Sequence, residues 1–256
     1  MSDLPFGLQI ILYLLMFFYG AIIGSFINVC TIRIPLGEDI IKKRSHCDDC
    51  GYELKWYDLI PIFSYLFLKG RCRKCKKKIS PRHLLMEVAL GILFVIVTAV
   101  YAISIKTLLY CLLVSSLLGL SVIDFETYEI PVGFNYFIAT LGVVRVLTDL
   151  KNWPSYLIGA VCVSLFLLFL YLISKGRAIG GGDVKLMAAC GLLLGWKLII
   201  LSFGIGCILG AVIHLIRMKV SKESHVLALG PYLSMGVFIA ALWGDKIIEW
   251  YLALIR

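Results

Sequence analysis

Two aspartates stand where apolar stretches of the chain end or begin, and their positions would suit acid–base chemistry. Asp124 follows the apolar stretch 107–123, and Asp183 follows Gly180, Gly181 and Gly182 just before the apolar stretch 185–195. Ionisable groups at such positions are costly and point to function. Two carboxyls held close together cannot both ionise easily, so one can act as an acid and the other as a base. Such a pair could activate water against an amide.

Each of these carboxylates also has a simpler interpretation. Asp124 could be an interfacial charge that ends a helix, and Asp183 could be the N-cap of the helix that follows it. Glu126 and Glu129, in the same loop as Asp124, could be solvated charges. The glycines before Asp183 favour the functional interpretation, because they leave room for an extended peptide to approach the backbone.

A second constellation lies in the only long polar segment, residues 31–82. Two Cys-x-x-Cys pairs, Cys47 with Cys50 and Cys72 with Cys75, are separated by 21 residues. Each pair presents two thiolates from one tight turn, and two such turns complete a tetrahedral four-sulfur site of the zinc-ribbon type. Four protein ligands leave no open position, so the predicted zinc is structural. Disulfides are the alternative, and they are disfavoured if the loop is cytoplasmic.

Composition shows which elements must position these groups. The 256 residues are 61% hydrophobic and only 16% charged, which excludes an ordinary soluble domain and a disordered chain. Eight apolar stretches are candidates for membrane-spanning helices: about 6–30, 84–104, 107–123, 133–148, 154–174, 185–195, 198–216 and 227–253. The region 184–216 could instead be one bent helix with a re-entrant piece. The expected fold is an all-α polytopic membrane protein with a small zinc-ribbon-like loop domain.

The charge distribution predicts the orientation. The net charge is +9, and residues 31–82 hold 13 of the 25 Lys and Arg against six Asp and Glu. The positive-inside rule places this loop in the cytoplasm and the N-terminus outside. The loops 124–132, 174–184 and 217–226 are then cytoplasmic as well, which brings Asp124 and Asp183 to one membrane depth. The basic run is better explained by topology than by nucleic-acid binding, and no nucleic-acid partner is expected.

Six blocks of sequence, in order along nearly the whole chain, carry a resemblance to a known family. They are Gly24-Ser25-Phe26-Ile27-Asn28-Val29 with Arg33 and Pro35; the cysteine loop with Pro61-Ile62-Phe63-Ser64-Tyr65-Leu66 and Gly70-Arg71-Cys72; Ile79-Ser80-Pro81-Arg82 with Glu87; Asp124 with Ile130-Pro131; Gly180-Gly181-Gly182-Asp183-Val184-Lys185-Leu186; and Gly230-Pro231-Tyr232-Leu233. Together they resemble the prepilin peptidase, or type IV leader peptidase, family of GxGD membrane aspartic proteases. Val132 departs from the family pattern, which commonly has Asp after the proline.

The resemblance implies a bifunctional enzyme of the bacterial inner membrane. It implies cleavage of the basic leader of type IV prepilins, or of the pseudopilins of type II secretion, at the cytoplasmic face, followed by N-methylation with S-adenosylmethionine. Asp124 and Asp183 carry over as the catalytic pair. Cys47, Cys50, Cys72 and Cys75 carry over as the metal-binding set, associated with methylation. We expect a first span over 1–30, the cysteine loop over 31–83 and the peptidase bundle over 84–256. The acidic Glu126 and Glu129 are candidates for meeting the basic leader, and Gly180 to Gly182 for binding the substrate backbone.

Three alternatives remain open. A different GxGD protease, of the preflagellin or presenilin type, is disfavoured by the cysteine loop after the first span. An ion-binding carrier would show internal repeats with matching broken helices, and none is visible. A peptidase that has lost methylation is disfavoured by the intact cysteine set. The sequence carries no Rossmann-type glycine fingerprint, so the methyl-donor site is not placed by any motif.

Overall fold

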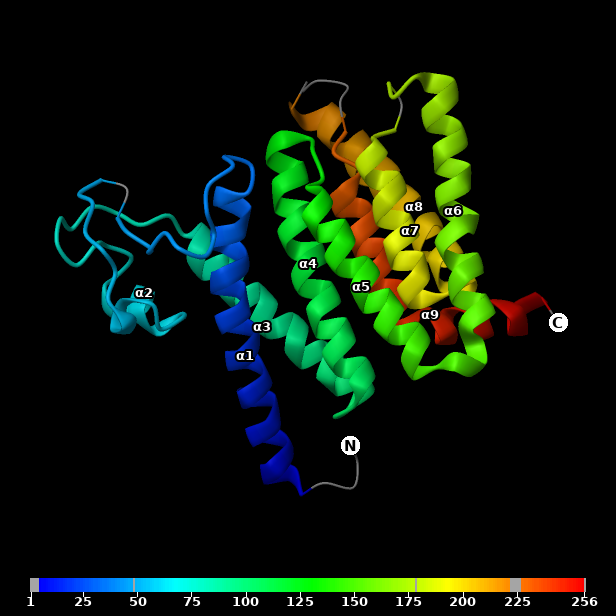
Figure 1. Ribbon diagram of the computed structural model, residues 1–256. Helices are drawn as coiled ribbons and strands as arrows, with labels where there is room; N and C mark the ends of the chain where they lie inside the picture. The colour runs from blue at the N-terminus through cyan, green and yellow to red at the C-terminus, as the bar shows by residue number, and fades with distance from the viewer. Residues whose placement is uncertain (1–4, 48, 178, 222–226, 256) are drawn as a thin grey trace. The chain divides into compact units, whose positions relative to one another are not determined.

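The computed structural model describes residues 5–47, 49–177, 179–221 and 227–255 (Figure 1). These residues are helical almost throughout and contain no strand longer than an isolated β-bridge. The α-helices are α1 (Phe6–Arg33), α2 (Phe63–Phe67), α3 (Arg82–Tyr101), α4 (Ile105–Thr127), α5 (Val132–Thr148), α6 (Trp153–Ser174), α7 (Gly181–Leu194), α8 (Trp196–Ser221) and α9 (Gly230–Ile255), with short 3-10 turns η1 (Trp56–Asp58) and η2 (Leu150–Asn152). The predicted all-helical architecture is confirmed.

Every predicted apolar stretch corresponds to a helix in the described part of the chain. Five stretches of these helices are long and apolar enough to cross a membrane: Phe6–Arg33, Arg82–Tyr101, Ile105–Thr127, Leu150–Ser174 and Trp196–Ile216. Helix α5 is a shorter apolar helix of 17 residues, and α7 has 14 residues. Five of the eight predicted spans therefore meet these criteria among the described residues, as in a multi-pass membrane protein, and α5, α7 and α9 do not.

Some boundaries differ from the prediction. Helix α7 begins at Gly181, so Asp183 lies in its first turn and not in a preceding loop. Helix α4 continues to Thr127, so Asp124 lies within its last turn. Helix α8 continues to Ser221, so half of the predicted loop 217–226 is helical, and the predicted loop charge at Lys222 lies outside the described residues.

The alternative of one bent helix over 184–216 is wrong. Helix α7 ends at Leu194 and α8 begins at Trp196. Between them stands Gly195 with φ +86°. This backbone conformation breaks the helix and suits glycine, which lacks a Cβ.

The chain divides into two compact units, Met1–Ser115 and Ser116–Arg256, and the division falls within α4. In the first unit α1 packs along α3. A Cβ on Gly20 would lie 2.6 Å from the carbonyl oxygen of Leu90, and a Cβ on Gly24 would lie 2.7 Å from that of Met86. Two glycines spaced four residues apart thus let the helix backbones touch, as small residues do in membrane helix pairs.

The second unit is organised around α7. This helix packs against α5, α6, α8 and α9, and its residues Leu186, Met187, Cys190 and Leu193 are fully buried. Helix α6 approaches it closely, because a Cβ on Gly159 would lie 2.5 Å from the carbonyl oxygen of Gly191. Asp183, in the first turn of this helix, is therefore buried as well.

Candidate functional site

Asp124 is held by the start of another helix. It is buried in the last turn of α4, and the backbone N–H of Gly230 donates to its Oδ2 at 2.9 Å. Gly230 is the first residue of α9, where backbone N–H groups lack intrahelical partners and the helix dipole favours negative charge. A Cβ on Gly230 would lie 2.7 Å from Asp124 Oδ2. Glycine is therefore needed here for this contact.

Asp183 is held by the first turn of its own helix. Its Oδ2 accepts the backbone N–H of Gly180, the N-cap residue, at 3.2 Å. The N-cap interpretation of Asp183 is thus wrong in position, although the carboxylate does satisfy the terminal N–H. Its other oxygen, Oδ1, is buried and has no hydrogen-bond partner among the described residues. The bond to Oδ2 therefore fixes the position of the side chain.

The two carboxyls belong to one site. Asp124 and Asp183 are 59 positions apart in the sequence, but the glycines beside them contact one common side chain, that of Ile130. Ile130 packs between their supports: a Cβ on Gly182 would lie 2.9 Å from Ile130 Cβ, and a Cβ on Gly230 would lie 3.2 Å from Ile130 Cδ1. The supports of both carboxyls thus meet at one side chain, and the facing of the two aspartates as a catalytic pair stays a prediction.

The remaining predicted residues lie around this pair. Gly180 is exposed, and Gly181 and Gly182 are half-buried at the start of α7. Glu126 and Glu129 are exposed at the end of α4 and just beyond it. Their roles toward a substrate stay predictions.

Two supporting residues were not found by reasoning from residue types. Gly230 was named only as part of the block Gly230-Pro231-Tyr232-Leu233, with no role of its own. Its N–H bond to Asp124 joins residues 106 positions apart. Asn135 on α5 is buried, and its side-chain N–H donates to the carbonyl of Gly182 at 3.5 Å. A buried asparagine in an apolar stretch is a signal that could have been used, because such an amide needs partners.

The four cysteines of the loop form one cluster. Their sulfur atoms all lie within 4.8 Å of one another. Cys47 Sγ is 3.9 Å from Cys75 Sγ, and Cys50 Sγ is 3.9 Å from Cys72 Sγ. A tetrahedral zinc with Zn–S bonds of about 2.3 Å separates its sulfurs by about 3.8 Å. The cluster therefore fits a zinc ion, and all four cysteines are free thiols and not disulfides.

The loop builds the cluster from two copies of one turn. In each copy the N–H of the first cysteine donates to the carbonyl five residues later, from Cys47 to Tyr52 and from Cys72 to Lys77. The carbonyl of the same cysteine accepts the N–H of the residue four positions later, which is Gly51 in the first turn and Lys76 in the second. The residue four positions on has positive φ in both turns, 66° at Gly51 and 59° at Lys76. The backbone N–H of Cys75 and, with a smaller effect, that of Lys74 donate to the Cys72 sulfur and lower the pKa of this thiol to about 7. The lowered pKa favours the thiolate, which is the form that binds metal.

An ion pair fixes the second turn to the rest of the loop. The Arg73 guanidinium donates to the buried Asp58 at 2.7 Å and lies over the ring of Tyr57, 4.9 Å from its centroid. Asp58 also accepts the backbone N–H of Lys55 at 3.3 Å. The turn η1 is thus clamped to the cysteine turn that contains Arg73.

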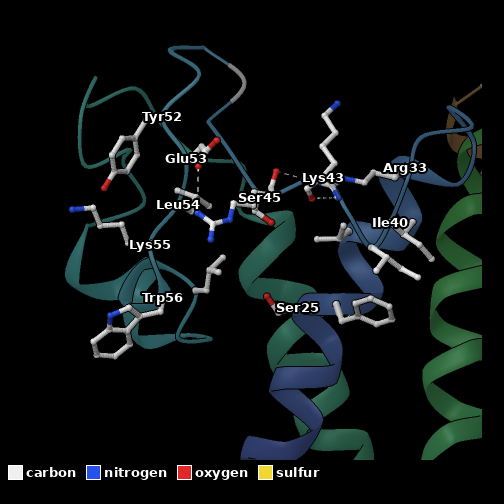
Figure 2. Close-up of a pocket in the computed structure, with 15 residues that line it drawn as sticks. Ser25, Arg33, Ile40, Lys43, Ser45, Tyr52, Glu53, Leu54, Lys55 and Trp56 are labelled. Atoms are coloured by element: carbon white, nitrogen blue, oxygen red, sulfur yellow. Dashed lines mark hydrogen bonds and ion pairs between the residues drawn. The ribbon is translucent and has the colours of Figure 1, made fainter.

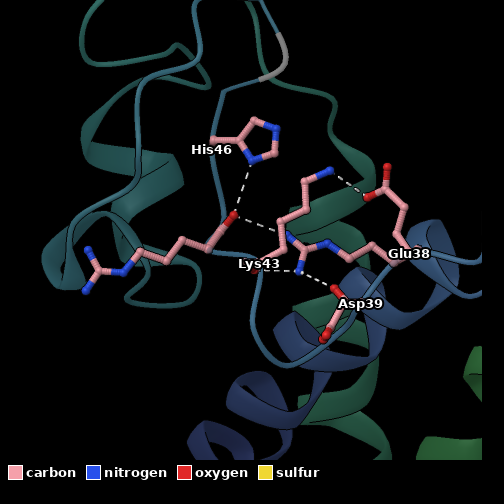
Figure 3. Close-up of polar contacts among 6 residues, drawn as sticks. Glu38, Asp39, Lys43 and His46 are labelled. Atoms are coloured by element: carbon pink, nitrogen blue, oxygen red, sulfur yellow. Dashed lines mark hydrogen bonds and ion pairs between the residues drawn. The ribbon is translucent and has the colours of Figure 1, made fainter.

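Arg33 ties the loop to the end of α1. Its guanidinium donates to the backbone carbonyls of Lys43 at 2.7 Å and of Asp39 and Arg44 at 3.3 Å. Figure 3 shows this arrangement, together with the Lys43–Glu38 ion pair at 2.8 Å. The loop over 39–44 is therefore folded against the helix end by a buried cation.

Two cavities adjoin the loop. One of about 900 Å³ is open and is lined by Ser25, Arg33 and Ile40 on one side and by Tyr52, Lys55 and Trp56 on the other (Figure 2). The second, of about 410 Å³, reaches from Cys47 and Cys72 to His83 and Glu87 on α3. Both volumes fall within the range of small-molecule sites.

Comparisons with known proteins agree over most of the chain. Residues 18–101 match the family model "Bacterial Peptidase A24 N-terminal domain", and residues 111–215 match "Type IV leader peptidase family". A Bacillus subtilis protein is 32% identical and covers 93% of this chain and 97% of its own. An Aeromonas hydrophila protein is 32% identical and covers 98% of this chain and 97% of its own. One from Klebsiella pneumoniae is 37% identical and covers 71% of this chain and 85% of its own. All three are named prepilin leader peptidase/N-methyltransferase. No solved structure matches.

Proposed function

The chain belongs to the type IV leader peptidase family, and from this we propose that it is a prepilin leader peptidase and N-methyltransferase. It cleaves the leader from type IV prepilins or pseudopilins and then methylates the new N-terminal residue. The observation that carries the peptidase assignment is the buried pair Asp124 and Asp183, held by backbone N–H groups from two helix starts.

The pair hydrolyses the peptide bond without a covalent intermediate. The ionised carboxylate takes a proton from water, whose oxygen attacks the scissile carbonyl carbon. The protonated carboxyl gives its proton to the carbonyl oxygen. When the tetrahedral intermediate collapses, the C–N bond breaks, and the carboxyl that took the proton from water gives it to the leaving nitrogen. The other carboxylate recovers its proton from a hydroxyl of the intermediate, which becomes the carbonyl of the new carboxyl terminus. We assign the ionised role to Asp124, because the start of α9 stabilises its charge, and the proton to Asp183, whose Oδ1 has no hydrogen-bond partner in the part of the chain that the structure describes.

The substrate enters the site along the start of α7. The backbone of Gly180 to Gly182 leaves room for an extended peptide beside Asp183. Glu126 and Glu129, exposed at the end of α4, attract the basic leader. The apolar helix of the prepilin stays in the bilayer, so its scissile bond lies at the depth of the two aspartates.

The orientation follows from the charges. The N-terminus lies outside, and the cysteine loop and the aspartates lie on the cytoplasmic side of the bacterial inner membrane. This places the peptidase site on the side where newly made prepilins carry their basic leaders.

Two bound groups complete the proposal. Cys47, Cys50, Cys72 and Cys75 would hold a zinc ion, which would cross-link the two turns and stabilise the loop. S-adenosylmethionine would supply the methyl group for the new α-amine. The cavities beside the cysteine loop have the volume for such a donor, which supports placing methylation in the first unit.

The test is to weigh the products of two parallel reactions. The purified protein in lipid is incubated with a prepilin, with and without S-adenosylmethionine. The proposal predicts loss of the leader in both reactions and a mass gain of one methyl group only with the donor. Intact prepilin in both reactions would refute the peptidase activity, and cleavage without the mass gain would refute the methylation.

A further inference from the structure

The cysteine loop contains a segment that resembles the membrane spans more than the loop around it. Residues 59–68, Leu-Ile-Pro-Ile-Phe-Ser-Tyr-Leu-Phe-Leu, carry no charge and lie between Asp58 and Lys69. Helix α2 lies inside this segment. An apolar run of about 10 residues is too short to span a bilayer and is typical of a buried or re-entrant piece.

The segment is not buried within the protein. Phe67 is 83% exposed and Leu66 58%, and Ile60 and Phe63 are exposed as well. In a polar loop surrounded by water, a contiguous apolar patch of this kind would be a liability. Another apolar surface must therefore cover it.

The location of the segment indicates which surface this is. The Phe63 ring stacks on the ring of Phe18, with centroids 5.8 Å apart. Phe18 lies 15 residues before Arg33, the end of α1, which corresponds to about 22 Å along the helix. It is exposed on a stretch that is apolar enough to cross a membrane. Figure 1 shows α2 beside the middle of α1 and away from the end where the loop begins.

The backbone of the segment is suited to an environment without water. Ile62 has φ +66° and ψ −56°, and the N–H of Phe63 donates to the carbonyl of Pro61 at 2.6 Å, which closes a strained γ-turn. The Ile62 N–H takes no part in the hydrogen bond of this turn. The buried carboxylate of Glu87, on α3, accepts this N–H at 2.7 Å.

Several other backbone donors of the segment also have protein partners. Pro61 has no N–H, and the backbone N–H groups of Ser64, Leu66 and Leu68 donate to carbonyls within the segment at 3.0–3.1 Å. Irregular backbone at membrane depth is tolerated only when its polar groups have protein partners. Glu87 thus supplies the acceptor that water supplies in an ordinary loop.

We propose that residues 59–68 form a re-entrant segment that enters the bilayer beside α1 from the side of the cysteine loop. The acyl chains of the lipid cover Ile60, Leu66 and Phe67. The exposed Trp56 and Lys69 at its two ends lie at the headgroup level, where aromatic and basic side chains are favoured. The cysteine loop is therefore attached to the membrane at a point between its two metal-binding turns.

The experiment measures which medium surrounds the segment. A fluorescent amino acid with environment-sensitive emission replaces Phe67 in the full-length protein, reconstituted in bilayers of phosphatidylcholine and phosphatidylglycerol. The matched control replaces Ile41, which is 86% exposed in the same loop. Quenching by lipids with brominated acyl chains is compared with quenching by iodide in the water. No substrate is present, so the result does not depend on peptidase activity.

The proposal predicts blue-shifted emission at position 67, with strong loss of intensity from brominated lipid and little from iodide. Position 41 should show the reverse. A second probe at Leu66 repeats the measurement in case the first variant folds poorly. Strong iodide quenching at 66 and 67 would overturn the proposal, and so would shielding from both quenchers, which would mean that protein covers the segment.

Discussion

The backbone nitrogen of Gly230 lies 2.9 Å from Oδ2 of Asp124 and donates a hydrogen bond to it. This contact joins the end of α4 to the start of α9. It places a helix N-terminus against a carboxylate that would otherwise be costly to bury in ionised form. The site therefore depends on a residue that has no side chain and no chemistry of its own.

Replacing Gly230 with Ala should strongly reduce leader cleavage. The new Cβ would lie 2.7 Å from Asp124 Oδ2, so the carboxylate or α9 must move, and a misplacement of about 1 Å can cost roughly 100-fold in rate. The measurement is the initial rate of leader removal. Gly133→Ala is the matched control, because nothing lies within 4 Å of a Cβ there. Equal rates for the two variants would contradict the role given to this contact.

Zinc should co-purify with the protein in a ratio of about one ion per chain, as a single four-cysteine site requires. Cys47→Ser and Cys72→Ser should each lose it, since both remove a ligand from the cluster. Cys162→Ser is the control, because Cys162 lies on α6 outside the cluster. Elemental analysis decides this prediction, and a wild-type protein free of zinc would refute the zinc ribbon.

The two cysteine turns should respond differently to changes at equivalent positions. Gly51 and Lys76 both have positive φ, which costs a non-glycine residue about 1–2 kcal/mol. No atom lies within 4 Å of a Cβ on Gly51, so Gly51→Ala tests the backbone alone.

The Gly51→Ala variant should lose zinc to a competing chelator about tenfold more readily, the equivalent of ~1.4 kcal/mol. Lys76→Gly should retain zinc at least as well as the wild type, because it relieves the same strain. Chelator titration of the three proteins provides the comparison. Identical retention in all of them would mean that these turns do not govern metal binding.

Charge reversal at the end of α4 should weaken binding of the leader. Glu126→Lys with Glu129→Lys should raise KM for a prepilin with a basic leader about fivefold, the equivalent of ~1 kcal/mol for exposed charges, and leave kcat unchanged. A leader with acidic residues in place of its basic ones should show the opposite preference. Added salt should reduce the difference. If KM does not respond to either change, these glutamates do not meet the leader.

The sequence predicts helices here far better than it predicts contacts. Long apolar stretches bounded by charges determine where a membrane helix begins and ends, so the predicted 154–174 became Trp153–Ser174. The bond between Gly230 and Asp124 and the one between Ile62 and Glu87 join distant residues. No local pattern of hydrophobicity reports them. The cysteine cluster is the exception, because each metal-binding turn supplies two cysteines at a fixed spacing, and this spacing can be recognised in the sequence.

The central claim is that Asp124 and Asp183 together hydrolyse the leader peptide bond. Its most direct test is the rate of leader cleavage by Asp124→Asn and Asp183→Asn, with Asp245→Asn, an exposed aspartate on α9, as the control. Removing an acid or a base costs about 10²–10⁴-fold in rate, so both site variants should lose cleavage while retaining the helical content and zinc of the wild type. The control should cleave normally. Full cleavage by either site variant would contradict the claim.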